Sequence, residues 1–191
     1  MKVLLLPATR YPGVRAHLSS DDEIGNIAIA QINHRVDARL NGILGGKDES
    51  VEMSGLELLR AAASGHLPGS SMGKTVPMSF AEVDVGYVKI TARAGSQHLN
   101  PFGGVHGGFA ATVLDSVTGC AVHSMLEAGV GYGTIDLQVK MLRPVPRDRD
   151  VVADGRTVHL SRNIATSEGT LKSLDGKLLA TATATCFLKR G

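Results

Sequence analysis

The residues best suited to chemistry lie where a polar, glycine-rich loop runs into a long apolar stretch. The loop ends in His106-Gly107-Gly108, and the apolar stretch over residues 109–126 has one carboxylate in its first half, Asp115. Apolar or small residues on nearly every side of the helical wheel predict a buried helix. The N–H groups at the start of a helix have no partner within it and carry partial positive charge, so they favour an anion there. Burying an unpaired carboxylate is costly, so Asp115 needs a partner or a catalytic task.

The segments on either side of this helix predict strands. Residues 134–141 alternate most cleanly, which places Ile135, Leu137, Val139 and Met141 on one face, and Gly129 to Gly133 before them predict a turn. A run of strands around one buried helix predicts an α+β domain, with an antiparallel sheet wrapped on the helix. The remaining predicted strands are a hairpin over 80–84 and 87–93 that turns at Val85-Gly86, and strands at 151–160, 164–171 and 178–188, the last two joined by the two-residue hairpin signal Asp175-Gly176.

The N-terminal part divides into an extension, residues 1–50, and the start of a domain over residues 51–191. Within the extension, a capping box and apolar residues every four positions predict a helix over residues 21–44, and the alternative is a frayed tail. Ser54 predicts the cap of a second helix over residues 55–63, with Gly65 in the C-cap position. Residues 67–74 are typical of a turn-rich connector.

Composition excludes several classes of function. A net charge of +2 is too small to indicate a nucleic-acid-binding protein, and no run of Lys or Arg indicates a membrane surface. The N-terminal apolar run is too short for a secretory signal. The two cysteines, Cys120 and Cys186, lie in apolar surroundings and outside any zinc spacing, as expected of reduced thiols in a cytoplasmic protein.

One motif resembles a known family. The run His98-x-Asn100-x-x-Gly103-x-Val105-His106-Gly107-Gly108, with an acid nine residues after His106, resembles the hotdog-fold acyl-CoA thioesterases. The closest branch contains the phenylacetate-degradation and 4-hydroxybenzoyl-CoA thioesterases. The likeness covers residues 54–188 and includes the Ser54-Gly-Leu-Glu-Leu-Leu-Arg opening, the Asp136-Leu-x-Val strand closing on Leu142-Arg143-Pro144, and the final Asp-Gly hairpin with its Ala-Thr-Ala-Thr strand. Residues 1–50 and the connector 70–77 have no counterpart in this pattern.

The resemblance implies a hotdog fold, hydrolysis of an acyl-CoA thioester without a cofactor, and a set of site residues. The Gly107 N–H would polarise the thioester carbonyl, and Asp115 would act as general base or nucleophile. Asn100 would lie near the thioester and the attacking water, and its alternative is a turn residue bonded to its own backbone. The Thr134 hydroxyl would orient the water, and its alternative is ordinary strand preference. His106 would contact the carbonyl or fix the loop.

Geometry within one helix argues for a second copy of the chain. Eight positions separate Gly107 from Asp115, which corresponds to about 12 Å of helical rise. That is too far for both to act on one carbonyl, so Asp115 is expected to face the Gly107 loop of another chain. The family shares two sites across a dimer in this way, which implies a homodimer or a dimer of dimers, that is, a homotetramer.

The substrate prediction is an acyl-CoA. Gly108 would leave room for the substrate, and Arg143 and Arg162 are the preferred candidates to bind the CoA phosphates, with Arg156 and Lys189 as further cations on or beside the late strands. Each of them is also explained as a solvated surface charge. An aryl and a medium-chain acyl group both stay open, because the shape of the pocket depends on the partner chain and on the unmatched connector. Phe102 and Phe109 are the nearest aromatic residues to the site.

Three alternative hypotheses for the function stay open. The same fold could dehydrate a 3-hydroxyacyl thioester, which would need His106 or His98 paired with the acid. It could bind an acyl-CoA without turnover, or hydrolyse an acyl-carrier-protein thioester. The spacing of His98, His106 and Asp115 matches no metal motif, so no metal is expected. Fold alone does not separate these functions.

Overall fold

The computed structural model describes residues 53–190. The predicted extension over residues 1–50, with its helix over residues 21–44, lies outside the described residues. The described residues contain a six-stranded sheet in the order β1-β2-β4-β5-β6-β3, in which all neighbouring strands are antiparallel. The strands are β1 (Met78–Asp84), β2 (Tyr87–Arg93), β3 (Gly131–Met141), β4 (Asp150–Leu160), β5 (Ile164–Ser173) and β6 (Leu178–Lys189).

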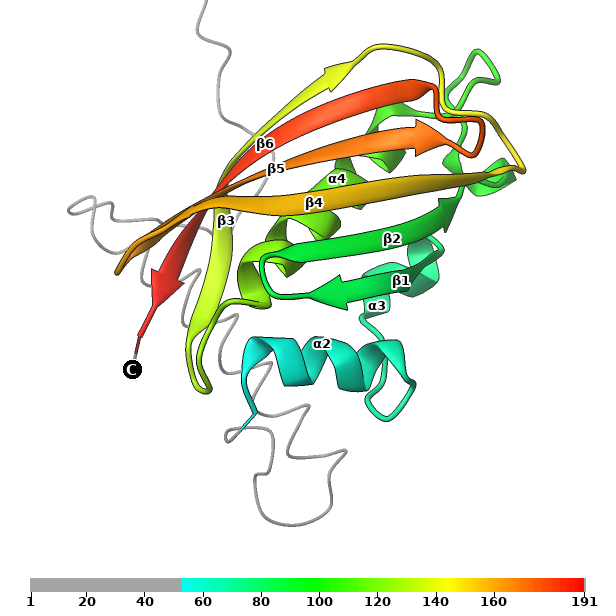
Figure 1. Ribbon diagram of the computed structural model, residues 1–191. Helices are drawn as coiled ribbons and strands as arrows, with labels where there is room; N and C mark the ends of the chain where they lie inside the picture. The colour runs from blue at the N-terminus through cyan, green and yellow to red at the C-terminus, as the bar shows by residue number, and fades with distance from the viewer. Residues whose placement is uncertain (1–52, 191) are drawn as a thin grey trace, which may run out of the picture. The chain divides into compact units, whose positions relative to one another are not determined.

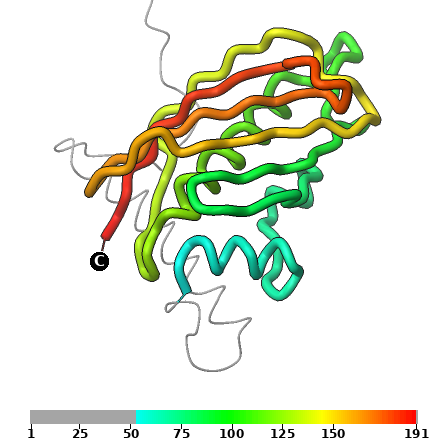
Figure 2. Tube along the Cα trace, viewed as in Figure 1, coloured from blue at the N-terminus to red at the C-terminus, as the bar shows by residue number. Residues whose placement is uncertain are grey.

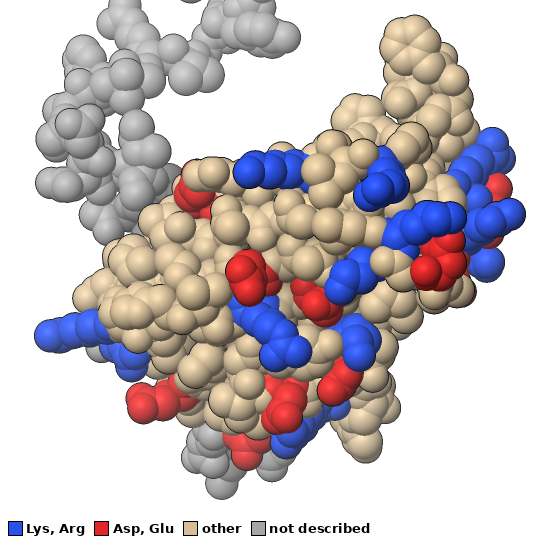
Figure 3. All heavy atoms as spheres, turned by 45° about the horizontal axis from the view of Figure 1, so that its top comes forward, with Lys and Arg blue, Asp and Glu red and all other residues tan. Residues whose placement is uncertain are grey.

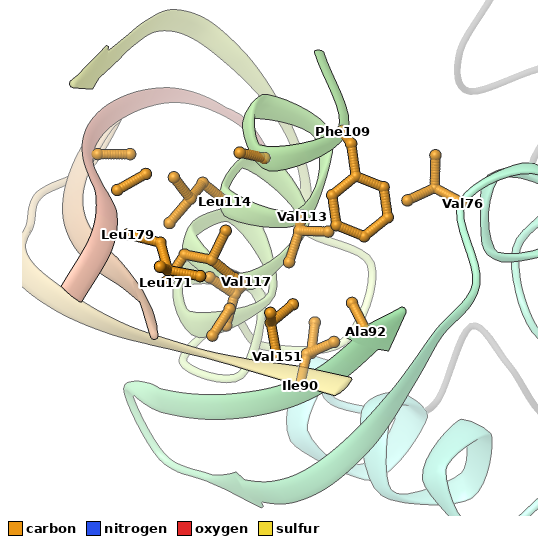
Figure 4. Close-up of a cluster of buried hydrophobic side chains, with 14 of the residues drawn as sticks. Val76, Ile90, Ala92, Phe109, Val113, Leu114, Val117, Val151, Leu171 and Leu179 are labelled. Carbon is orange, nitrogen blue, oxygen red and sulfur yellow. The ribbon is translucent and has the colours of Figure 1, made fainter. Parts of the chain in front are cut away.

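The sheet curves around one long helix, α4 (Gly107–His123), as the ribbon and the Cα trace both show (Figures 1 and 2). This confirms the predicted antiparallel sheet wrapped on a central helix. Inside the curve, α4 side chains meet side chains from the strands and form one apolar core (Figure 4). Its largest members include Ile90, Val113, Leu114, Val117 and Leu171.

A pair of glycines lets α4 lie close against the sheet. Gly155 of β4 and Gly169 of β5 stand opposite each other in the strand register. A Cβ added to Gly155 would lie 2.5 Å from the Val117 carbonyl oxygen, and one added to Gly169 would lie 2.9 Å from Cγ2 of Thr118. Any larger residue at Gly155 would therefore collide with the helix backbone, which fixes the depth at which α4 sits.

Helix α2 (Gly55–Ala63) forms where the sequence predicts it. Its cap is a complete capping box, in which Ser54 Oγ accepts from the Glu57 N–H and Glu57 Oε2 accepts from the Ser54 N–H at 2.7 Å. The C-cap is Ser64 rather than Gly65, and Gly65 follows it with φ of +80°. This is the left-handed position just past a helix end, which glycine fills without strain.

The connector after α2 differs from the prediction. A short helix, α3 (Ser71–Thr75), lies in the segment expected to consist of turns. Ser70 caps it, and its Oγ accepts from the Gly73 N–H at 3.3 Å. Five residues are too few for a helical apolar period to show in a sequence, so only the cap carried a signal.

Strand β3 also differs from its predicted pattern. It starts at Gly131, inside the predicted glycine-rich turn, and it forms an edge of the sheet. The register shifts between Thr134 and Asp136, so Ile135 is a bulged residue and 63% exposed. Met141 is 50% exposed, whereas Leu137 and Val139 pack against the core as predicted. A bulge inserts one extra residue and breaks the alternation on which the prediction rested.

The predicted hairpins both form. Gly86 turns the β1–β2 hairpin with φ of +67°. The β5–β6 connection is longer than the predicted two-residue turn: the Gly176 N–H donates to the Ser173 carbonyl at 2.9 Å, and residues 174–177 lie outside the strands. Gly176, with φ of +83°, completes this wider turn.

Candidate active site

The loop before α4 is built around Asn100. Its Oδ1 accepts from the N–H groups of Phe102 and Gly104 at 2.9 and 3.2 Å, and its own N–H donates to the Gly104 carbonyl at 2.8 Å. Phe102 stands at the loop tip with 97% of its surface exposed. Asn100 therefore does act as a turn residue. Within residues 53–190 its Nδ2 amine makes no hydrogen bond, so it is free to donate elsewhere.

His98 clamps this loop. Its Nδ1 accepts from the Gly95 N–H at 2.9 Å, which leaves the proton of the neutral ring on Nε2, 2.8 Å from the Thr75 carbonyl oxygen. The ring also packs edge-on against Phe109 at 5.2 Å. With both nitrogens engaged, His98 ties the end of α3 to the start of α4.

His106 caps α4 and leaves one backbone donor open. Its Nδ1 accepts from the Gly108 N–H at 2.8 Å, so the neutral ring presents Nε2–H outward. The Gly107 N–H, at the first position of the helix, has no partner within the described residues. It is exposed and aligned with the positive end of the helix dipole, as an oxyanion donor needs to be. Because the Gly108 N–H is occupied, a substrate contact by Gly108 would have to use its Cα.

Asp115 lies in the middle of α4 and is half-buried. Its Oδ1 is buried and has no hydrogen-bond partner within the described residues. Such an orphaned carboxylate oxygen costs free energy in the folded chain, about 1–3 kcal/mol or more for a charged group. The sequence left open that backbone or hydroxyl groups satisfy a buried Asp115. For Oδ1, no such partner exists among the described residues.

Thr134 lies on β3 and is exposed. Its Oγ1 is 4.0 Å from Sγ of Cys186, its partner in the β3–β6 register. The negative charge of Asp115 reaches the same thiol, where it adds to burial in raising the pKa of Cys186. Thr134 and Asp115, 19 positions apart in the sequence, thus both influence the Cys186 thiol.

Three further buried groups lie along α4 and the start of β3, and the Asp115 charge acts on two of them, Cys120 and Tyr132. Burial, with the Asp115 charge as a second cause, raises the pKa of the Cys120 thiol to about 12. Burial also raises the pKa of Tyr132 well above its ordinary value, and it lowers the pKa of His123. Sequence reasoning missed Tyr132, because Gly131 and Gly133 on either side of it predicted a turn. An aromatic residue between those glycines was the available signal.

Gly107 and Asp115 do not meet within one chain. Both belong to α4, and the rise of a helix over eight positions keeps them about 12 Å apart. One chain therefore supplies two separate parts of a possible site: a helix start with an open N–H, next to Asn100 and His106, and the acid Asp115.

The two preferred phosphate-binding cations, Arg143 and Arg162, lie at different ends of the sheet. Arg143 lines a hollow of about 640 Å³ at the end of the sheet where the β5–β6 turn lies, together with three other cations and two acids. Figure 3 shows basic side chains gathered at one end of the molecule. Arg162 lies in the turn after β4, so the ten-residue rise of that strand, about 33 Å, separates it from Asp150 at this hollow. The cations beside Arg143 are Arg93, Arg149 and Lys177, of which Arg93 pairs with Asp150 at 3.1 Å and Lys177 with Asp175 at 2.7 Å.

Two other features bear on the class of protein. In residues 53–190, no three His, Cys, Asp or Glu side chains converge as metal ligands would. None of the helices in this part of the chain is long and apolar enough to cross a membrane.

Comparison with known proteins identifies the family. The model of the thioesterase superfamily matches residues 102–180, which include the end of the loop, α4, the strands β3 to β5 and the start of β6. A solved phenylacetic acid degradation-related protein from Ralstonia eutropha is 34% identical, with 68% of this chain and 98% of that chain covered and a TM-score of 0.62. The chain belongs to the thioesterase superfamily. Its sheet wrapped on α4 is the hotdog fold of that superfamily.

Two further proteins are similar to this chain, the first of them in fold alone. The PaaI protein of the Escherichia coli phenylacetic acid degradation operon is 17% identical with a TM-score of 0.64, and 72% of this chain and 98% of that chain are covered. A curated protein from Halobacterium salinarum that carries an esterase name is 41% identical over 68 residues. That match covers 35% of this chain and spans 44% of the relative's own length.

Proposed function

We propose that this thioesterase-superfamily protein hydrolyses an acyl-CoA thioester to the free acid and CoA. The observation that carries the proposal is the partly buried Asp115, whose Oδ1 has no hydrogen-bond partner among residues 53–190, on a helix that begins with the open Gly107 N–H. A solved thioesterase from Streptococcus pneumoniae, 24% identical over 59% of this chain and 88% of its own with a TM-score of 0.55, contains coenzyme A, which supports the choice of CoA.

The proposed step uses the acid as a general base. Asp115 takes a proton from water as the water oxygen adds to the thioester carbonyl carbon. The Gly107 N–H donates to the oxyanion that forms, and the positive helix end stabilises it further. The tetrahedral intermediate then loses its C–S bond, and the CoA thiolate leaves with the proton from Asp115. The Thr134 hydroxyl and the Asn100 Nδ2 amine position the water, and His106 holds the loop through its cap.

Nucleophilic attack by Asp115 is the other route to the same products. The carboxylate would form an anhydride with the acyl group and expel CoA, and water would then hydrolyse the anhydride. Incorporation of ¹⁸O into the Asp115 side chain after one turnover in H₂¹⁸O would establish this route, because general-base catalysis never bonds the water oxygen to the Asp115 carboxyl carbon.

The complete site requires two copies of the chain. Because Gly107 and Asp115 are about 12 Å apart on one helix, we propose that the loop of one copy faces Asp115 of the other. The free edge of β3 is the surface we expect the copies to share. It carries exposed apolar side chains, and an unpaired edge strand is a template for pairing. These side chains are Ile135, Met141 and Leu142, with Phe102 on the loop.

The hollow at Arg143 is the proposed site of the CoA phosphates. Arg143 follows Met141 by two positions in the chain, and Cε of Met141 lies 3.4 Å from where a Cβ on Gly107 would stand. The hollow that Arg143 lines and the Gly107 N–H therefore lie at the same end of the fold. Arg162, at the far end of β4, is not expected to contact the same phosphates within one chain.

The test is release of CoA thiol from a panel of acyl-CoAs. Asp115→Asn is expected to lower kcat by about 10²–10⁴-fold, the range for loss of a general base. The control is Asp84→Asn, because Asp84 is an exposed acid at the opposite sheet edge that pairs with Arg60 at 3.5 Å and accepts from the Val85 N–H at 2.8 Å. Near-full activity of Asp115→Asn would refute the assignment. An enoyl product without thiol release would indicate the dehydratase instead, and tight binding without turnover would indicate a binding module.

A further inference from the structure

The helix face that carries Asp115 continues into a glycine with a tyrosine ring lying on it. Gly119 stands one turn beyond Asp115, and His123 stands one turn further, so the three share a face of α4. A Cβ added to Gly119 would lie 3.1 Å from Cε2 and 3.2 Å from the hydroxyl oxygen of Tyr132. The Tyr132 ring thus occupies the space into which any other residue at position 119 would project its own side chain.

The ring is held firmly in this place. Tyr132 lies near the start of β3, paired with Leu188 of β6, and its ring is 5.2 Å from the His123 ring at an angle of 40°. The thiols of Cys120 and Cys186 and the carboxylate of Asp115 are near enough for their charges to add to burial in raising the pKa of the Tyr132 phenol. Tyr132 is therefore a neutral, ordered aromatic surface immediately beyond the acid.

A thioester carbonyl at Asp115 must direct its acyl group along the surface around that acid. Toward the sheet, the neighbouring turns of α4 are closed by Leu114 and Val117, which are fully buried in the core. Along the helix toward its C-terminus, the next position is Gly119, which offers no side chain, and Tyr132 fills the space above it. The ring is therefore the group that an extending acyl chain would meet.

We infer that Tyr132, seated on Gly119 one turn beyond Asp115, is the wall that limits the length of the acyl group, so that the substrates are compact acyl thioesters rather than medium or long chains. This rests on the proposed thioesterase function. Removing the ring while keeping Gly119 opens a path over the helix toward His123. Each further methylene buried along that path is expected to raise kcat/KM about fourfold.

The experiment measures kcat/KM by thiol release for straight-chain acyl-CoAs from two to sixteen carbons and for benzoyl-CoA, with the full-length wild type, Tyr132→Ala and Tyr132→Phe. For Tyr132→Ala, the optimum is expected to move to longer chains by two or more methylenes, so that the ratio of long-chain to short-chain kcat/KM rises at least tenfold. Tyr132→Phe is expected to keep the wild-type profile, because the ring and not the hydroxyl is the obstacle. Tyr87→Ala is the matched control, because Tyr87 lies on β2 with Arg156 stacked over its ring at 4.4 Å, away from Asp115.

The outcomes distinguish this inference from the proposal on which it rests. A wild type that releases thiol from no acyl thioester refutes the proposed function. An active wild type with an unchanged profile in a folded Tyr132→Ala variant refutes the length limit alone, as does a wild-type optimum at long chains. If Tyr132→Ala does not fold, Tyr132→Leu decides, because it retains apolar packing on Gly119: an intermediate shift supports the inference, and no shift overturns it.

Discussion

The Gly107 N–H can be removed without disturbing the helix that carries it. Gly107 is the first residue of α4, and the preceding His106 is extended, with ψ of 137°. Proline is favoured at the first helical position, and it requires the residue before it to be extended, so Gly107→Pro fits the local backbone. A Cβ there would meet only Cε of Met141, at 3.4 Å, which is ordinary contact with a flexible side-chain end.

The expected loss follows from the role of one oxyanion donor. Removal of one such donor from an acyl-transfer site costs about 10²–10³ in kcat, or about 2.7–4 kcal/mol of transition-state stabilisation. Gly107→Ala keeps the N–H and adds the same Cβ, so it is expected to stay within a few-fold of the wild type. The free energy of unfolding should change by no more than about 1 kcal/mol in either variant.

Steady-state thiol release with one acyl-CoA, together with urea unfolding, measures both effects. A Gly107→Pro variant that folds normally and keeps more than a tenth of the wild-type kcat would refute the role of this N–H. An equal loss in Gly107→Pro and Gly107→Ala would show that the side chain, and not the missing donor, is responsible.

Other substitutions test the packing, the phosphate site and a buried histidine. Gly155→Ala is expected to lower the free energy of unfolding, measured with urea, by about 1–3 kcal/mol, because its Cβ would lie 2.5 Å from a helix carbonyl oxygen. Gly133→Ala is the control: a Cβ at position 133 would have nothing within 4 Å, so this variant should be neutral or stabilising. Arg143→Ala should raise KM for acyl-CoA but not for the matching acyl-pantetheine thioester, and Arg162→Ala should change neither; equal KM shifts on both substrates would remove Arg143 from the phosphate site. Burial lowers the pKa of His123 below 6.5. Below about pH 6.5 the unfolded chain therefore binds a proton that the folded chain does not, so the free energy of unfolding falls as the pH falls. His123→Gln should flatten this part of the curve of unfolding free energy against pH, and an unchanged slope would contradict the prediction.

The sequence predicted the local elements well because their signals are local. The cap at Ser54, the alternation before Pro144 and the Asp175-Gly176 turn each act over a few residues, and α2, β3 and the β5–β6 connection form close to where those signals place them. The errors have equally physical causes. A bulge at Ile135 breaks the alternation that the prediction assumed.

The candidate site was only half accessible to sequence reasoning. The loop motif and the lone acid in an apolar helix mark Gly107 and Asp115 without a structure. The packing of the Tyr132 ring against Gly119 and the distance between Arg143 and Arg162 depend on how strands far apart in the chain pair with each other. Contacts of that kind have no local signature, so the fold had to supply them.

Mixing two inactive variants tests most directly whether the site is shared between copies. Asp115→Asn keeps a working loop, and Gly107→Pro keeps a working acid, so each variant alone should be nearly inactive. When the two are unfolded together and refolded at equal concentration, random pairing should give half hybrid dimers with one complete site each, or about a quarter of the wild-type activity. A mixture as inactive as its components, with hybrid dimers demonstrated by mass spectrometry, would contradict a site built from two chains.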